Sequence, residues 1–371
     1  MFPPQIAHVF ISWLTQPGDI VYDPFSGRGT VPLEAVLSDR VGLGSDANPL
    51  SYSLTQAKVA VPRYIDVNER LGELERDYSN WKADFGTVPA DIAMLYAPGT
   101  LSQLEYLRKW LDRSRTTDAF LVAMILGMLH ANHSQKGATR GFSISMPNTF
   151  AMSPGYVAKY IEKHGLERPE VDVFAMLRGR AQRLKLPSKP MLSGRAWLQD
   201  ATADLPPWLQ NSRPKLIFTS PPYLEVIKYG KYNWVRLWFL GESARDVDER
   251  LMASGSLDRY VDFMTKVCMN LRTVIADDGY LCFVIGDVRR EAGYLNLAEV
   301  VWERAAQPLG WYRHAIIADH LPAGHKVSRI WKNNEGRATK VDRLLLLSPR
   351  KQDLPPLKAI RWGKTAFAER V

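Results

Sequence analysis

The order of elements near the start of the chain constrains its fold more than any other feature. Residues 19–23 form a short apolar run that is typical of a strand, and a glycine-containing loop follows over 24–29. Helical spacing over 30–39 then leads to a second apolar run at 41–45. Because two strands joined through one helix lie parallel in a sheet, this segment predicts a βαβ unit.

Alternation of strand and helix patterns resumes after residue 190. The predicted strands are 196–198, 216–218, 280–285, 311–318 and 344–347, and helices are predicted between them, including 257–276 and 297–306. A helix over 5–14 precedes the first strand. This alternation predicts an α/β fold, with a doubly wound, mostly parallel sheet that has helices on both faces.

Residues 61–190 show no alternating strand pattern and interrupt the predicted sheet. Helical spacing extends from 65 to 130 and again from 156 to 184. We therefore predict four segments: the N-terminal part of a sheet domain at 1–60, a mainly helical inserted domain at 61–190, the C-terminal part of the sheet domain at 191–350, and a basic tail at 351–371.

Basic residues are concentrated in two stretches. The 371 residues include 48 Lys and Arg against 39 Asp and Glu, which gives a formal net charge of +9. Residues 131–190 contain 10 basic and 4 acidic residues, and residues 313–371 contain 13 and 5. Segregated positive charge suits phosphate backbones, so a polyanion is a candidate partner.

Cysteine usage and hydropathy narrow the class of protein. The chain has 2 cysteines, Cys268 and Cys282, without a CxxC pair, so neither a disulfide framework nor a zinc site is predicted. His130 and His133 lack acidic or Cys partners nearby in sequence, which favours a hydrogen-bonded pair over metal ligands. The longest apolar run, 119–129, is half of the ~20 residues that span a bilayer. We expect a cytoplasmic protein with neither a metal site nor a membrane partner.

The loop after the first strand has the composition of a ligand-binding turn. Asp23-Pro24-Phe25-Ser26-Gly27-Arg28-Gly29-Thr30 lies between a strand and a helix, where glycines let a ligand approach the backbone. It lacks the third glycine of a dinucleotide loop and the Gly-Lys-Ser/Thr of a phosphate loop. Asp46 ends the next strand, where a carboxylate can bind ribose hydroxyls. The alternative is a purely structural turn.

A second motif follows the strand at 216–218. Thr219-Ser220-Pro221-Pro222-Tyr223 contains two consecutive prolines, which fix φ, remove two N–H donors and leave carbonyl oxygens that accept. An acceptor-rich turn beside a hydroxyl and an aromatic ring suits a planar group that carries an exocyclic NH₂. Pro-Pro turns also occur as structural turns that only end a strand, but the two motifs together favour a functional interpretation.

The two motifs resemble those of S-adenosylmethionine-dependent DNA methyltransferases that methylate exocyclic amino groups. DPFSGRGT is similar to their cofactor motif, FTSPPY to their catalytic motif, and FPPQIAHVFISWL to the helix that precedes the cofactor motif. The resemblance covers 1–60 and 195–347 and implies a Rossmann-like, seven-stranded methyltransferase sheet. The TSPPY form is typical of enzymes that methylate N4 of cytosine. N6-adenine enzymes more often carry Asp or Asn in place of Ser220, so adenine stays open as the alternative.

The resemblance also assigns roles to individual residues. It implies a pocket for S-adenosylmethionine formed by Phe2, Asp23, Pro24, Phe25, Gly27, Gly29, Thr30, Asp46, Asn48 and Asp200. It implies a catalytic turn formed by Ser220, Pro221, Pro222 and Tyr223. Asp200 is equally consistent with a capping residue at a strand-to-loop boundary, and Asp287 fits either a later family motif or a structural role. The insertion between the strands of Asp46 and Asp200 departs from familiar members.

The implied substrate is double-stranded DNA. A base in a duplex must be flipped out to reach such a pocket, and Tyr223 is the candidate to stack on it. Tyr229 is a candidate to line the mouth of the same pocket. Lys136 and Arg140 of the insertion are candidates to contact DNA and to help select the target. A restriction endonuclease acting on the same site is an expected partner. Methylation of structured RNA and a noncatalytic nucleic-acid-binding subunit are further alternatives.

Overall fold

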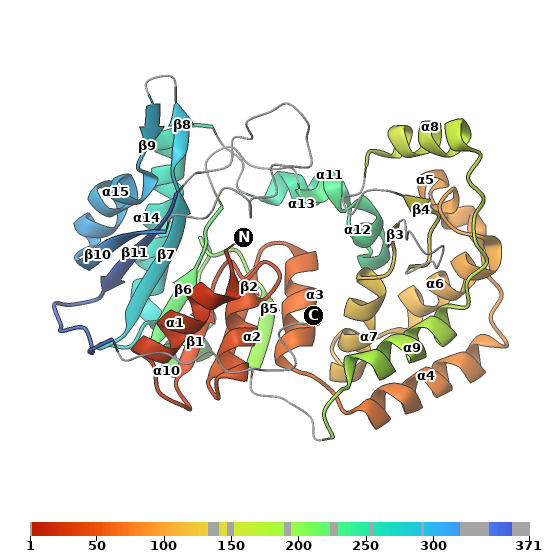
Figure 1. Cartoon of the computed structure of the whole chain (residues 1–371), viewed down its shortest axis with the longest axis horizontal. Helices are drawn as coiled ribbons and strands as arrows, with labels where there is room; N and C mark the ends of the chain where they lie inside the picture. Colours follow the sequence, from red (N-terminus) through yellow and green to blue (C-terminus); the bar gives the residue numbers. More distant parts are fainter. Residues whose placement is uncertain are drawn as a thin grey trace. The chain divides into compact units, whose positions relative to one another are not determined.

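The computed structural model describes residues 2–132, 141–146, 152–188, 194–222, 229–251, 255–290, 293–319 and 341–357. The chain divides into two compact units (Figure 1). The first unit comprises Met1–Thr55, Ser193–Ile227 and Met252–Lys364, and the second comprises Gln56–Leu192, Lys228–Leu251 and Thr365–Val371. Residues 228–251, which the sequence analysis placed with the sheet domain, therefore belong to the second unit.

The first unit is built on a seven-stranded sheet. In spatial order its strands are β10 (Tyr312–Asp319), β11 (Asp342–Ser348), β7 (Tyr280–Gly286), β6 (Leu216–Thr219), β1 (Ile20–Asp23), β2 (Val41–Asp46) and β5 (Gly194–Leu198). β11 is antiparallel to both of its neighbours, and the other pairs are parallel. Each strand that the sequence predicts is present, and the α/β, mostly parallel fold class is confirmed.

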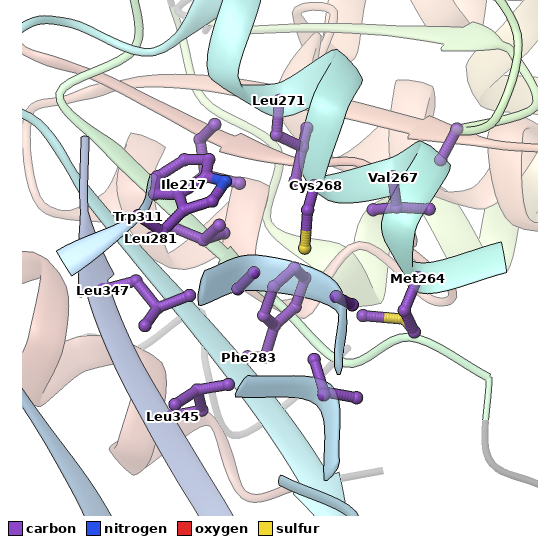
Figure 2. Packing of buried hydrophobic residues seen from close by; sticks show 14 of the residues in the cluster. Ile217, Met264, Val267, Cys268, Leu271, Leu281, Phe283, Trp311, Leu345 and Leu347 are labelled. Carbon is purple, nitrogen blue, oxygen red and sulfur yellow. The ribbon is translucent and has the colours of Figure 1, made fainter. Parts of the chain in front are cut away.

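Alternate residues of each strand face opposite layers of helices. On β7, Cys282 and Val284 pack with α1 (Pro4–Leu14) and α2 (Thr30–Leu37). Leu281 and Phe283 pack instead with the other layer of helices, shown from close by in Figure 2. That layer consists of α10 (Pro207–Ser212), α14 (Leu257–Val274) and α15 (Leu297–Val301). Because strand side chains alternate between faces, this pattern buries both faces of the sheet and makes it doubly wound.

The described part of the second unit is mainly helical. Its helices are α4 (Tyr64–Tyr78), α5 (Ala90–Ala93), α6 (Pro98–Trp110), α7 (Thr116–Leu126), α8 (Pro154–His164), α9 (Val173–Leu184), α11 (Tyr229–Tyr232), α12 (Trp234–Leu240) and α13 (Ala244–Arg250). A partly buried ion pair, in which Arg70 Nε lies 2.9 Å from Asp118 Oδ1, ties α4 to α7. Arg236 Nε donates to the Leu126 carbonyl at 3.0 Å and ties α12 to the end of α7.

The remaining elements are short or connect the units. Helix α3 (Pro49–Val59) runs from the first unit into the second. The short strands are β3 (Ala131–Asn132), β4 (Ser145–Met146), β8 (Val288–Arg290) and β9 (Gly293–Leu295), and the single-turn helical segments are Phe85–Thr87, Trp302–Ala306 and Gln307–Leu309. In the described ranges, every helix is too short or too polar to cross a bilayer.

Truncation of Phe283 tests whether the layer in Figure 2 holds the sheet together. Phe283 is 0% exposed, so Phe283→Ala removes buried apolar surface and leaves a cavity. We expect the free energy of unfolding, measured by urea titration, to fall by about 3–5 kcal/mol. Met269→Ala on α14 is the control, because Met269 is 51% exposed and its truncation should have little effect. Equal effects of the two substitutions would contradict this packing.

Candidate functional site

Polar residues follow neighbouring parallel strands at one edge of the sheet. β6, β1, β2 and β5 are adjacent and parallel, so their carboxyl ends lie at the same edge. Asp23 and Asp46 end β1 and β2, and Ser220 follows β6 directly. The chain order reverses between β1 and β6, and open α/β sheets bind their ligands at such a switch point. This edge of the first unit is therefore the candidate site.

The loop between β1 and α2 is fixed by contacts with Ser45 and Thr55, and it has open space beside Gly27. Gly29 has φ +75°, and a Cβ there would lie 2.9 Å from the Thr55 Cα, so only glycine fits. Ser26 is held on both sides: its N–H donates to the Ser45 carbonyl at 3.0 Å, and its hydroxyl accepts from Thr55 Oγ1 at 3.1 Å. Gly27 has φ +53°, and among the described residues a Cβ there would meet only the Phe25 carbonyl at 3.9 Å. A ligand can therefore approach the Gly27 backbone.

Asp46 connects this loop to the end of β2. Its Oδ2 accepts from the Gly27 N–H at 2.8 Å, and its Oδ1 accepts from the Asn48 N–H at 2.9 Å. Removal from water raises the pKa of Asp46 to about 6, although these hydrogen bonds and one from Ser51 favour the charged form. A carboxylate has about four lone-pair sites, so Asp46 can also accept from a ligand hydroxyl.

Asp23 joins β1 to β6 at the switch point. Its Oδ1 accepts from the Phe25 N–H at 3.0 Å and from Thr219 Oγ1 at 2.5 Å. The side chain is buried, and this removal from water raises its pKa to about 7, with a smaller contribution in the same direction from the negative charge of Asp46. These bonds give Asp23 a structural task, and its direct contact with a cofactor stays a prediction.

The Ser-Pro-Pro turn presents acceptors to the same edge. The Ser220 hydroxyl donates to the Val284 carbonyl at 3.1 Å. With its hydrogen committed to that bond, the Ser220 oxygen can contact another group only as an acceptor. Pro221 is buried and Pro222 is half-buried, and neither has an N–H to donate. Tyr223 lies outside the described residues, as do Lys136 and Arg140, so their predicted roles stay predictions.

Asp200 follows β5 at the same edge and caps its own turn. Its Oδ1 accepts from the N–H and from the hydroxyl of Thr202, both at 2.8 Å, and the residue is exposed. The capping role that the sequence left open is therefore present. Asp287 also has a structural partner, because Arg343 Nε and Nη2 donate to its two oxygens at 2.6 and 2.9 Å.

The other predicted cofactor residues have packing or backbone contacts of their own. Phe2 packs on Phe218 with ring centroids 5.4 Å apart, and Phe25 packs on Phe263 at 5.8 Å. Asn48 Oδ1 accepts from the Leu50 N–H at 3.0 Å near the start of α3. Pro24 is buried, and Thr30 begins α2. Tyr229 is 47% exposed on α11 of the second unit, and its predicted place at the mouth of the substrate pocket stays a prediction.

Two residues that hold the site together were not predicted from the sequence. Thr219 lies in the catalytic motif, but its bond to Asp23 spans 196 positions and has no local signal. Thr55 lies on α3, where nothing in the sequence indicates a contact with Ser26. In the described segments, no group of three or more His, Cys, Asp or Glu side chains is arranged to hold a metal ion.

Comparisons with known proteins add little to this geometry. No protein-family model and no curated protein sequence matches the chain. Among solved structures, TrmN from Thermus thermophilus aligns at 10% identity and a TM-score of 0.34, covering 94% of this chain and 49% of that one. The rRNA methyltransferase aviRa from Streptomyces viridochromogenes aligns at 11% identity and a TM-score of 0.35, covering 94% and 86%.

A provisionally assigned DNA modification methylase, also from Thermus thermophilus and in complex with S-adenosyl-L-methionine, aligns at 19% identity and a TM-score of 0.24. That alignment covers 42% of this chain and 54% of the other. The aligned parts of this chain thus span about half the length of two of these three proteins. With TM-scores below 0.5, none of these likenesses identifies a function.

Replacing Asp23 tests its raised pKa. The folded chain retains a proton on Asp23 up to about pH 7, whereas an exposed Asp, with a pKa of 3.8, has already lost it. Protonation therefore stabilises the fold fully below about pH 4, and this stabilisation is lost as the pH rises through about 7. We expect the free energy of unfolding of the wild type, relative to Asp23→Asn, to fall between these pH values.

The measurement is urea unfolding at a series of pH values. Tyr22→Phe is the control, because Tyr22 lies on the same strand as Asp23. This substitution removes the contact between the Tyr22 hydroxyl and Ser45 Oγ, 2.8 Å apart, and removes no carboxyl. Its difference from the wild type should not change with pH. A difference for Asp23→Asn that is constant or rises with pH would contradict the assigned protonation.

Proposed function

We propose that the chain is an S-adenosylmethionine-dependent DNA methyltransferase that methylates the exocyclic N4 of cytosine. The observation that carries the proposal is the position of the Ser-Pro-Pro turn. It directly follows β6, and Thr219 just before it is bonded to Asp23 of the glycine-containing loop. A loop suited to the cofactor and a turn suited to an amino group therefore meet at one switch point.

The residues at this edge fit S-adenosylmethionine. The open space beside Gly27 admits a ligand to the backbone, and Asp46 has acceptor capacity for ribose hydroxyls. Asp23 and Asp46 place two carboxyl groups near a ligand that carries a positive sulfonium. When bound, S-adenosylmethionine supplies a methyl group on a sulfonium, which is a good leaving group. Asp200, at the end of the next strand, is proposed to contact the adenine amino group.

Ser220 and Pro221 are proposed to hold the amino group of the target base. That nitrogen is a poor nucleophile because its lone pair is delocalised into the ring. Two N–H groups donating to the Ser220 oxygen and the Pro221 carbonyl would favour a pyramidal nitrogen with its lone pair directed at the methyl group. The bond between Ser220 and Val284 supports this role, because a hydroxyl that donates its hydrogen can contact a further group only as an acceptor. Catalysis is then mainly positioning.

The remaining assignments are part of the same proposal. The base is flipped out of the duplex and stacked on Tyr223, and the second unit, with Lys136, Arg140 and Tyr229, contacts the DNA and selects the target. A restriction endonuclease that cleaves the same site is the proposed partner, and the cytoplasm is the proposed location. The Ser in the catalytic turn favours cytosine over adenine.

Asp46→Asn tests the cofactor pocket. Asn retains one acceptor oxygen but loses the charge, and its NH₂ would face the N–H of Gly27 or Asn48. We expect the dissociation constant for S-adenosylhomocysteine, measured by calorimetry, to rise about tenfold or more. Asp277→Asn is the control, because this 80% exposed side chain pairs with Arg213 on the surface. An unchanged constant for Asp46→Asn would place the cofactor elsewhere.

Ser220→Ala tests the catalytic turn. We expect it to bind S-adenosylhomocysteine and DNA like the wild type but to lose most of its turnover, since the acceptor for the amino group is gone. Ser212→Ala is the matched control, because the Ser212 hydroxyl also donates to a backbone carbonyl, that of Trp208 at 2.9 Å. Near-normal kcat in Ser220→Ala would remove Ser220 from catalysis.

The reaction itself is followed with labelled S-adenosylmethionine, unmodified plasmid DNA and nucleoside mass spectrometry. N4-methylcytosine is the expected product. N6-methyladenine would retain the mechanism and change the base. Label that appears in structured RNA but not in DNA, or in neither, would contradict the proposed substrate.

A further inference from the structure

The second unit contains a cavity of about 330 Å³ at the end of α6. Its walls come from α6, α7 and the end of α12, and they include the apolar side chain of Phe239, which is 4% exposed. The volume lies at the small end of the range for ligand sites. All of the lining residues belong to the second unit, so this cavity is separate from the candidate site described above.

The rim of the cavity is positively charged. Arg108, Lys109 and Arg113 line it against one carboxyl, that of Glu105. Arg108 is already engaged, because its Nε donates to the Trp238 carbonyl at 2.9 Å and its Nη1 lies 3.5 Å from Glu105 Oε1. Lys109 and Arg113 are exposed, and within the described ranges given above no carboxylate pairs with either. Two cations at the rim can therefore bind an anion.

Aromatic rings hold one of these cations in place. The Lys109 ammonium lies 4.9 Å from the centroid of the Trp81 ring and 5.7 Å from that of Trp110. Trp110 is 52% exposed, so a large aromatic surface lies beside the cationic rim. Cations alternating with aromatic rings are the combination that proteins use to bind nucleic-acid strands, through phosphates and stacked bases.

Two buried polar atoms in the lining residues lack a hydrogen-bond partner in the described part of the chain. They are the donor Trp81 Nε1 and the acceptor Glu105 Oε1, which accepts no hydrogen bond although the Arg108 guanidinium lies 3.5 Å from it in an ion pair. Buried polar atoms without partners are rare in native proteins, and a bound molecule is one of the ways in which they are satisfied. A donor and an acceptor together match the edge of a nucleobase, which carries both.

We propose that this cavity binds a single nucleotide, with its base between the apolar walls and its phosphate at Lys109 and Arg113. Trp81 and Glu105 line the space that the base would occupy. The choice of a nucleotide among anionic ligands rests on the proposed function, and its source is either the substrate strand or a free nucleotide. The last turn of α6 also gains from cations next to its carbonyls, but Arg113 lies beyond that helix and is not explained by this effect.

The experiment titrates deoxycytidine monophosphate, a short single-stranded oligodeoxynucleotide and inorganic phosphate into the full chain by calorimetry. In the double variant Lys109→Gln/Arg113→Gln, the dissociation constant for the nucleotide should rise about tenfold or more. Arg259→Gln/Lys266→Gln is the matched control, because it removes the same charge from exposed positions on α14 of the first unit. Glu105→Gln should weaken the binding of the nucleotide and leave the binding of inorganic phosphate unchanged. Thermal unfolding verifies that each variant folds.

The arms distinguish the source of the nucleotide. If the double variant loses binding of both the nucleotide and the oligodeoxynucleotide, the cavity is a site for the substrate strand. If it loses binding of the nucleotide alone, the cavity is a site for a free nucleotide. The inference is overturned if the wild type does not bind the nucleotide, if inorganic phosphate binds equally well, or if the double variant behaves like its control.

Failure of the cavity and failure of the proposed function give different results. Nucleotide binding that depends on Lys109 and Arg113, in a chain that methylates no nucleic acid, would retain the cavity and reject the function. Methylation with an unchanged KM for DNA, together with unchanged nucleotide binding in the double variant, would retain the function and reject the cavity.

Discussion

The hydrogen bond between Thr219 and Asp23 is the interaction on which the rest of the site depends. It joins the carboxyl ends of β6 and β1, which the sheet places next to each other although 196 positions separate the two residues. Through Asp23 it reaches the Phe25 N–H, and therefore the loop that the cofactor would contact. The same bond holds Thr219, the residue directly before Ser220. One buried contact thus sets the distance between the two motifs.

Much of the fold follows from local sequence pattern, and the joints between distant segments do not. Strands such as 280–285 are predicted because their apolar run is long and is bounded by turn residues. Residues 228–251 were predicted with the sheet domain, whereas the structure groups them with the second unit. The apolar pattern of α12 does not reveal which core this helix joins. Its buried apolar side chains pack in the second unit, and bonds from Arg236 to Leu126 and from Arg108 to Trp238 add to this contact, which no local pattern indicates.

The candidate site was predicted through its motifs, and their chemistry was refined by the structure. The glycines of the loop were expected to admit a ligand, and Gly27 has the open space for this, whereas Gly29 is needed for close packing on Thr55. The pKa values of Asp23 and Asp46 could not be predicted, because they arise from burial that depends on the whole sheet. Asp200 was ambiguous in sequence because one residue type serves both capping and binding.

A structure of the full chain with bound S-adenosylhomocysteine tests the central claim most directly. The account predicts its ribose hydroxyls at Asp46, its amino-acid part beside Gly27, and its sulfur facing the turn at Ser220 and Pro221. A ligand bound away from the carboxyl ends of β1 and β2, or one whose sulfur faces away from that turn, would contradict the account.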